Sequence, residues 1–221
     1  MLDVPLLIVA LLVAAPSLTQ ADLTLVQHVE GGGQAGDQTI RIKGDKGRTD
    51  LTPTVSMITD GATGEMVTLM HSGKTYLKIP PDQTKSMMDQ LQKYRTSPEP
   101  AKLQPTGKKE KVGEYDCDIY TSSLGSITVT YWLAKDYPNY QEVLAQLIKF
   151  QAGTISAMGK GLMPELKDFP GMIMKTEVDK DGKKVVSTLV SAKEENVDPK
   201  IFDIPKGYTE ITSPALNFQP K

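Results

Sequence analysis

Few side chains in this sequence are suited to catalysis or to metal binding. Among its 221 residues are one cysteine and two histidines, so one chain holds neither an internal disulfide framework nor a Cys-rich metal site. No G-x-S-x-G nucleophile elbow occurs, and His28 and His71 fall in segments that alternate like β-strands. Carboxylates are plentiful, but the sequence singles out no pair for acid–base work. We therefore predict a non-enzymatic protein without a cofactor or a metal, and keep a carboxylate-based enzyme as a weaker alternative.

Two short motifs match ligand-binding signatures in residue type and spacing, but not in their predicted structural context. Residues 31–36 (GGGQAG) fit G-x-G-x-x-G, but the residues after them alternate like a strand, whereas a dinucleotide site needs a helix there. Residues 177–182 (EVDKDG) resemble the start of a calcium loop, but Thr188 stands where that loop needs a glutamate. We interpret both segments as hairpin turns.

Methionine is the residue type that suggests a ligand. The methionines that follow Met1 are Met57, Met66, Met70, Met87, Met88, Met158, Met163, Met172 and Met174. Flexible thioethers fill cores and also line adaptable apolar binding surfaces. We rank core packing first and an apolar pocket second. Copper(I) binding, suggested by Met172 and Met174 on one strand face, ranks third.

Composition and charge exclude further classes. Hydrophobic residues make up 39% and charged residues 24% of the chain, which is ordinary for a globular protein. The net charge of −2 argues against a nucleic-acid binder, because neutralising phosphates needs an excess of Lys and Arg. No apolar run approaches the roughly 18 residues of a membrane span, so we predict no transmembrane segment.

The N-terminus predicts export. Residues 6–15 (LLIVALLVAA) form a short apolar core of the length found in secretory signals. Pro16 ends this core, and Thr19 and Ala21 place small residues at the positions that precede a cleavage site. We predict cleavage near Ala21 and a periplasmic or secreted protein. In that oxidising compartment the single Cys117, which alternation places on one strand face with Tyr115 and Ile119, is predicted to be a buried core residue; the alternative is a reactive thiol or an intermolecular bridge.

Periodicity predicts an antiparallel sheet with two helices. Ten short alternating segments are separated by turns that contain Gly and Asp. They are residues 23–29, 38–43, 48–51, 55–59, 65–71, 74–79, 114–121, 126–134, 172–179 and 183–192. Helical spacing of apolar residues occurs in residues 82–95 and 139–151. The predicted fold class is α+β: a curved antiparallel sheet of about ten strands, an unclosed half-barrel, covered by two main helices.

The predicted organisation is one domain behind a signal peptide. The signal covers residues 1–21, the half-barrel domain residues 22–212, and a loose C-terminal tail residues 213–221. Within the domain, an N-terminal half (22–95) and a C-terminal half (107–212) are joined by a proline-rich linker (96–106).

Several segments resemble a known family. They are residues 42–50 (IKGDKGRTD), 60–66 (DGATGEM), 74–79 (KTYLKI), 113–120 (GEYDCDIY), 131–136 (YWLAKD) and 198–208 (DPKIFDIPKGY). Together they resemble the exported bacterial DUF4412 proteins, a family of unknown function, over nearly the whole mature chain. The resemblance implies a fold like that of the LolA/LolB lipoprotein carriers, an unclosed half-barrel plugged by helices, whose apolar cavity receives acyl chains.

From these observations we predict an exported binding protein for an apolar ligand, such as an acyl chain, a lipid or a lipoprotein moiety. The side chains assigned to this ligand are Met66, Met70, Met87, Met88, Leu91, Val143, Leu147, Met172 and Met174. The alternative is an envelope scaffold or protein-interaction module with a filled core, a protein partner and no ligand. The two hypotheses differ in whether the purified protein carries a lipid and in whether charged substitutions such as Met88→Asp or Leu91→Asp impair ligand binding.

Overall fold

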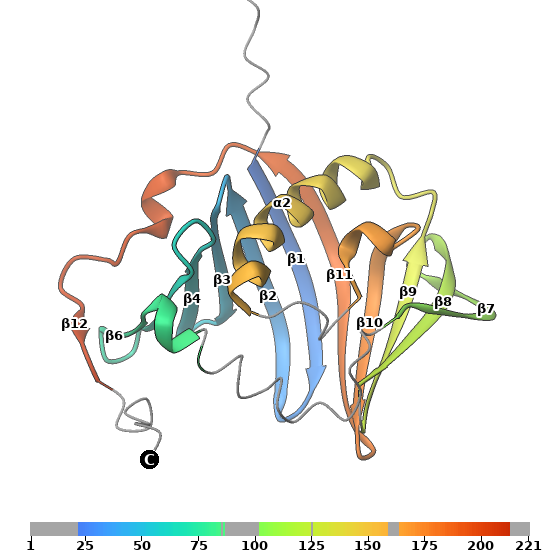
Figure 1. Cartoon of the computed structure of the whole chain (residues 1–221), viewed down its shortest axis with the longest axis horizontal. Coiled ribbons are helices and arrows are strands. Elements are labelled where there is room, and N and C mark those ends of the chain that lie inside the picture. The colour runs from blue at the N-terminus through green and yellow to red at the C-terminus, as the bar shows by residue number, and fades with distance from the viewer. Residues whose placement is uncertain (1–21, 85, 87–101, 125, 159–163, 213–221) are drawn as a thin grey trace, which may run out of the picture.

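One curved sheet forms the body of the protein (Figure 1). This computed structural model describes residues 22–84, 86, 102–124, 126–158 and 164–212. The strands are β1 (Asp22–Gly31), β2 (Gln34–Lys43), β3 (Lys46–Thr52), β4 (Val55–Asp60), β5 (Glu65–Met70), β6 (Thr75–Ile79), β7 (Gln104–Val112), β8 (Tyr115–Leu124), β9 (Ile127–Ala134), β10 (Met172–Lys180), β11 (Lys183–Glu195) and β12 (Thr209–Glu210). Their order is β12-β6-β5-β4-β3-β2-β1-β11-β10-β9-β8-β7. The sheet is therefore open, with β12 and β7 at its edges.

Hairpins build most of this sheet, and their registers follow from the apolar pattern. Neighbouring strands are antiparallel, except that β12 runs parallel to β6. In the β1–β2 pair, Leu23 lies opposite Ile42, which keeps apolar side chains on one face. Gly32 and Gly33 form the connecting turn with φ of 61° and 83°, a conformation that a two-residue hairpin turn needs. The glycine motif is thus a hairpin turn, as predicted.

The long helix α2 (Tyr140–Met158) lies across one face of the sheet (Figure 1). Its apolar stripe places Val143 in the buried core, with Leu147 and Phe150 packed against that core. Phe150 sits directly on Gly47 of β3, where a Cβ atom would come within 2.3 Å of the ring. The absence of a side chain at Gly47 therefore lets the helix approach the sheet closely.

The C-terminal strap, residues 197–211, covers the opposite face of β3 to β6. It contains the short 3-10 helix η2 (Pro199–Phe202), whose turn begins where the Asp198 side chain accepts a hydrogen bond from the Lys200 backbone amide. Phe202 and Val197 pack in a second buried cluster with Ile58, Val67 and Leu69. At the sheet edge, β12 completes the strap through hydrogen bonds from its backbone to β6.

Two strands add to the ten that alternation predicts. β7 begins at Gln104, inside the segment predicted as a linker (96–106). It has eight exposed residues and one buried one, so it has no apolar alternation to detect. Pro105 and a register shift mark it as an edge strand. β12 has two residues, held to β6 by backbone pairing and by a hydrogen bond from the Tyr76 hydroxyl to Glu210. The sheet therefore has 12 strands instead of the predicted ten or so, and strands make up more of the protein than the predicted α+β class implies.

The helical predictions have different outcomes. Helix α2 confirms the predicted helix at 139–151 and continues to Met158. Of the predicted helix at 82–95, only the beginning is described, and residues 81–84 and 86 are helical. A second short 3-10 helix, η1 (Leu166–Asp168), precedes β10. The predicted signal (1–21) and tail (213–221) lie outside the described residues. None of the described helices has the length and apolar character to cross a membrane.

Candidate functional site

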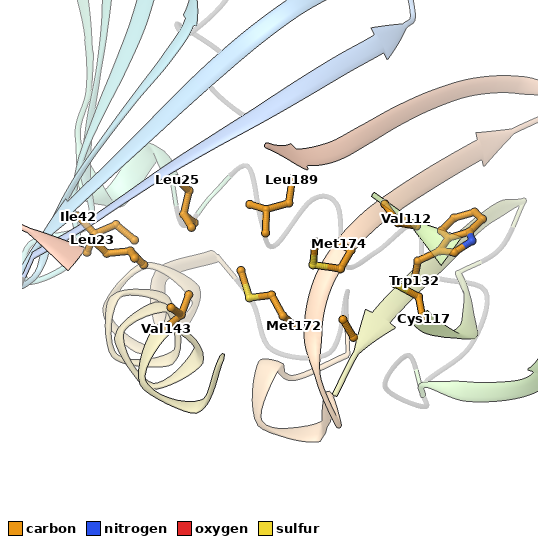
Figure 2. Packing of buried hydrophobic residues seen from close by; sticks show 11 residues of the cluster. Leu23, Leu25, Ile42, Val112, Cys117, Trp132, Val143, Met172, Met174 and Leu189 are labelled. Atoms are coloured by element: carbon orange, nitrogen blue, oxygen red, sulfur yellow. The ribbon is translucent and has the colours of Figure 1, made fainter. Parts of the chain in front are cut away.

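A buried apolar cluster beneath α2 joins the two halves of the sheet (Figure 2). Its members are Leu23, Leu25, Ile42, Val112, Cys117, Trp132, Ala134, Val143, Met172, Met174 and Leu189. Burial of one such large side chain contributes about 1.5–3 kcal/mol to folding. In this region methionine therefore acts as a core residue: Met172 and Met174 are 3% and 5% exposed.

A different set of apolar side chains lies on the α2-facing side of β4 to β6. Gly47, which contacts Phe150 of α2, is opposite Thr59, and Thr59 is opposite Met66. Directly opposed residues share a face, and so do residues two apart along a strand. Met57 and Met70 therefore lie on the same face as Met66. Leu77 and Ile79 of β6 join them, because Ile79 is opposite Met66.

We call these five side chains, Met57, Met66, Met70, Leu77 and Ile79, the apolar strip. All five are half-buried. Within the described part of the chain, none of the five belongs to, or packs against, the cluster beneath α2, the cluster under the strap, or a third buried cluster of Tyr131, Leu133 and Phe169. The strip therefore continues the apolar face beyond the packed core and leaves thioether and aliphatic surface in partial contact with solvent.

The structure places the predicted ligand residues in two groups. Val143, Met172 and Met174 are in the buried cluster, and Leu147 packs against it. Met66 and Met70 are in the apolar strip. Met87, Met88 and Leu91 lie outside the described residues. The strip members Met57, Leu77 and Ile79 were not in the predicted set, because their common face with Met66 follows from the registers of β4, β5 and β6.

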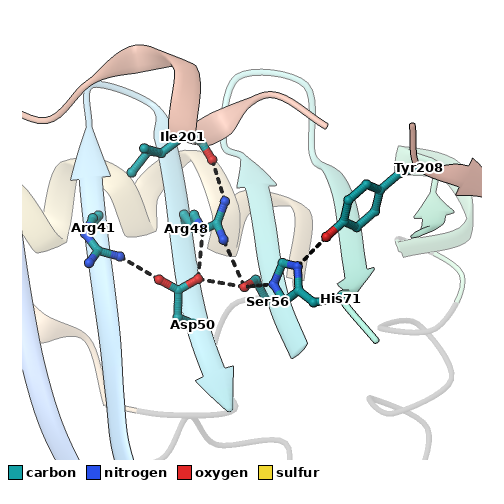
Figure 3. Close-up of polar contacts among 7 residues, drawn as sticks. All are labelled: Arg41, Arg48, Asp50, Ser56, His71, Ile201 and Tyr208. Carbon is teal, nitrogen blue, oxygen red and sulfur yellow. Dashed lines mark hydrogen bonds and ion pairs between the residues drawn. The ribbon is translucent and has the colours of Figure 1, made fainter. Parts of the chain in front are cut away.

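On the strap side of the same strands lies a polar network that the sequence did not indicate (Figure 3). Asp50 accepts hydrogen bonds from Arg41, Arg48 and Ser56, at 2.6, 2.8 and 2.6 Å. Arg48 also donates to the backbone carbonyl of Ile201 in η2, at 3.0 Å. The network therefore binds the strap to β3 and β4.

The donors and acceptors in this network determine which ring nitrogen of His71 carries the proton. Ser56 donates its one hydroxyl proton to Asp50 and accepts from Arg48 Nη2. His71 Nε2, 2.7 Å from Ser56 Oγ, must then donate to it. In the neutral ring Nδ1 is left to accept from the Tyr208 hydroxyl, at 2.7 Å. His71 thus connects β4 to the strap, which is a structural role.

The model of a family described as a domain of unknown function, DUF4412, matches residues 22–208. The chain belongs to the DUF4412 family. This match confirms the resemblance found in the sequence. No curated protein matches this DUF4412 chain.

Solved structures share only a distant likeness with this DUF4412 protein. PNGF-II has 13% identity and a TM-score of 0.43, over 89% of this chain and 32% of its own, so the chain spans about a third of that protein. The Mycobacterium tuberculosis lipoprotein LppX has 10% identity and a TM-score of 0.40, over 81% of this chain and 89% of its own. A DUF1329 family protein from Desulfovibrio piger has 11% identity and a TM-score of 0.29, over 85% of this chain and 91% of its own. Likenesses at this level are too weak to assign a function.

Reactive chemistry has little support among the described residues of the DUF4412 domain. Ser56 contacts His71, but it is 1% exposed and its proton is held by Asp50. Cys117 is fully buried, and burial raises the pKa of its thiol, which disfavours the reactive thiolate. No group of three or more His, Cys, Asp or Glu side chains in the described ranges could hold a metal ion. Met172 and Met174, the pair that suggested copper(I), lie within the buried apolar cluster, where a cation would lose its hydration.

The polar network predicts a pH dependence of stability. Partial burial alone would raise the pKa of Asp50, but hydrogen bonds from Ser56, Arg48 and Arg41 and the charge of Arg48 lower that pKa below its ordinary value of 3.8. A carboxyl group whose pKa is lowered by folding stabilises the fold above its ordinary value, and this contribution is lost as the pH falls through the folded-state value. We expect Asp50→Asn to lower the free energy of unfolding by about 1–3 kcal/mol near neutral pH.

Urea unfolding at about pH 7 and about pH 3 measures this effect. The difference between Asp50→Asn and the wild type should shrink at the lower pH. Asp203→Asn, at an exposed carboxyl in the strap, is the matched control and should change stability by less than about 0.5 kcal/mol. An equal loss for Asp50→Asn at both pH values would contradict the electrostatic role.

Proposed function

We propose that this DUF4412 protein is an exported, non-catalytic binding protein that holds an acyl chain or another lipid moiety against the apolar strip. The observation that carries the proposal is the strip itself: five half-buried apolar side chains, three of them methionine, on the α2-facing side of β4 to β6. They are outside the packed clusters, so a ligand could bury them without displacing the core.

The chemistry of the strip supports an apolar and flexible ligand. Its members have no hydrogen-bonding group beyond the weak thioether acceptor, so recognition would come from apolar contact rather than from directed polar bonds. Methionine side chains adapt to irregular shapes, which suits a chain with many rotatable bonds. Burying about 100 Å² of apolar surface contributes roughly 2.5 kcal/mol, so a long acyl chain could supply useful affinity.

Export is the second part of the proposal. It is supported by the apolar segment at 6–15 followed by the small residues Thr19 and Ala21. A carrier or binder of acyl chains has a ready supply of ligand at the cell envelope.

Mass spectrometry of the purified mature protein tests this function. We expect native spectra to contain a species carrying one lipid, and organic extraction to release that lipid. A lipid-free mass, together with no mass shift after incubation with envelope phospholipids, would overturn the proposal and favour a scaffold that binds a protein partner.

A further inference from the structure

The methionines whose side chains are described differ sharply in their access to solvent. Met57, Met66 and Met70 in the apolar strip are half-buried. Met172 and Met174 lie in the core and are 3% and 5% exposed. The same residue type therefore occurs in two environments of one sheet. A reagent dissolved in the solvent has access to the methionines of the apolar strip but not to those of the core.

The thioether of methionine reacts with peroxides. A sulfur lone pair attacks one peroxide oxygen, the S–O bond forms as the O–O bond breaks, and with hydrogen peroxide the other oxygen leaves as water after proton transfer. Sulfur is oxidised by two electrons and the peroxide is reduced. The product, methionine sulfoxide, is polar, and methionine sulfoxide reductases reverse the step. The reaction requires contact between the sulfur and the oxidant, so exposure decides which methionines react first.

We propose that the apolar strip is a site of reversible methionine sulfoxidation by peroxides, and that oxidation there releases the apolar ligand. The second half of this statement rests on the proposed function; the first half does not. Each sulfoxide places a strong dipole where the ligand would make apolar contact. Because burial of a polar group without a partner is unfavourable, each should weaken binding by roughly 10-fold.

Peptide mapping tests the oxidation site, and the sequence makes the comparison direct. Trypsin releases all three strip methionines in one peptide, residues 49–74, and both core methionines in another, residues 168–175. After brief treatment of the ligand-free folded protein with dilute hydrogen peroxide, we expect peptide 49–74 to carry sulfoxide at least about ten times faster than peptide 168–175. In urea the rates per methionine should become equal. The assignment would be overturned if both peptides oxidised at equal rates per methionine in the folded protein. It would also be overturned if peptide 49–74 still oxidised faster in urea.

Binding of a fluorescent stearic acid analogue tests the switch. Oxidation should weaken binding by the wild type by at least about 10-fold, and reduction by a methionine sulfoxide reductase should restore it. The triple variant Met57→Leu, Met66→Leu, Met70→Leu keeps apolar volume without an oxidisable sulfur. Its affinity for the probe, measured before and after the same peroxide treatment, should change less than about twofold, whatever the starting value.

Two results would overturn the switch: an unaffected wild type, or an equal loss in the triple leucine variant. A reduced wild type that binds no probe would contradict the proposed function and, with it, the switch. The mapping experiment would still decide the oxidation site by itself.

Discussion

Phe202→Ala is expected to lower the free energy of unfolding by about 3–5 kcal/mol, which is a large part of the stability of a typical domain. Phe202 is 6% exposed and packs in the cluster formed by Ile58, Val67, Leu69 and Val197. Its removal would leave a cavity between the strap and the sheet, where the backbone is already held by hydrogen bonds and cannot collapse freely. Equilibrium unfolding in urea, followed by circular dichroism, measures the change.

Ile211→Ala provides the matched control for this prediction. Ile211 belongs to the same strap but is 39% exposed, and its backbone amide keeps its bond to Tyr76 whatever the side chain. We expect a loss of less than about 1 kcal/mol. If Phe202→Ala costs no more than this control, the strap is not part of the cooperative core.

The double variant Met66→Asp, Met70→Asp is expected to weaken binding of the fluorescent stearic acid analogue by about 100-fold or more. Both side chains lie in the apolar strip on β5, and each substitution introduces a charge where the ligand would exclude water. Because both positions are half-buried, the carboxylates can reach solvent in the free protein. The fold should therefore survive, which circular dichroism and the urea midpoint check.

Val190→Asp is the control for the added charge. Val190 is on β11, is 59% exposed and is not part of the strip. This variant should bind the probe as tightly as the wild type, within about twofold. Unchanged binding by the Met66→Asp, Met70→Asp variant would place the ligand elsewhere. An equal loss in Val190→Asp would show a general effect of charge on association.

The two predictions concern opposite faces of the same strands. On one face of β4 and β5, Ile58, Val67 and Leu69 are buried under the strap. On the other face, Met57, Met66 and Met70 are half-buried and outside the clusters. The packed strap side supports the strands, and the adaptable methionines lie on the α2-facing side. This arrangement suits a binding surface for a flexible apolar ligand.

Local pattern was enough to predict most of the sheet and the long helix. Ten strands were found because alternation of apolar and polar residues has the period of a half-buried strand. α2 was found because Val143 and Leu147 recur at helical spacing. β7 was missed because its residues are almost all exposed, and β12 because two residues contain no period. Edge strands are defined by the partner they pair with rather than by their own sequence.

For the candidate site, alternation alone places methionines on strand faces and puts Met66 and Met70 on the same face. Tertiary structure decided which methionines are core and which are half-exposed, because that depends on where α2 and the buried cluster end. It also decided the role of His71, whose partners Ser56 and Tyr208 lie 15 and 137 residues away along the chain. Periodicity reports which face a side chain occupies, whereas burial and hydrogen bonding depend on what the rest of the chain places against that face.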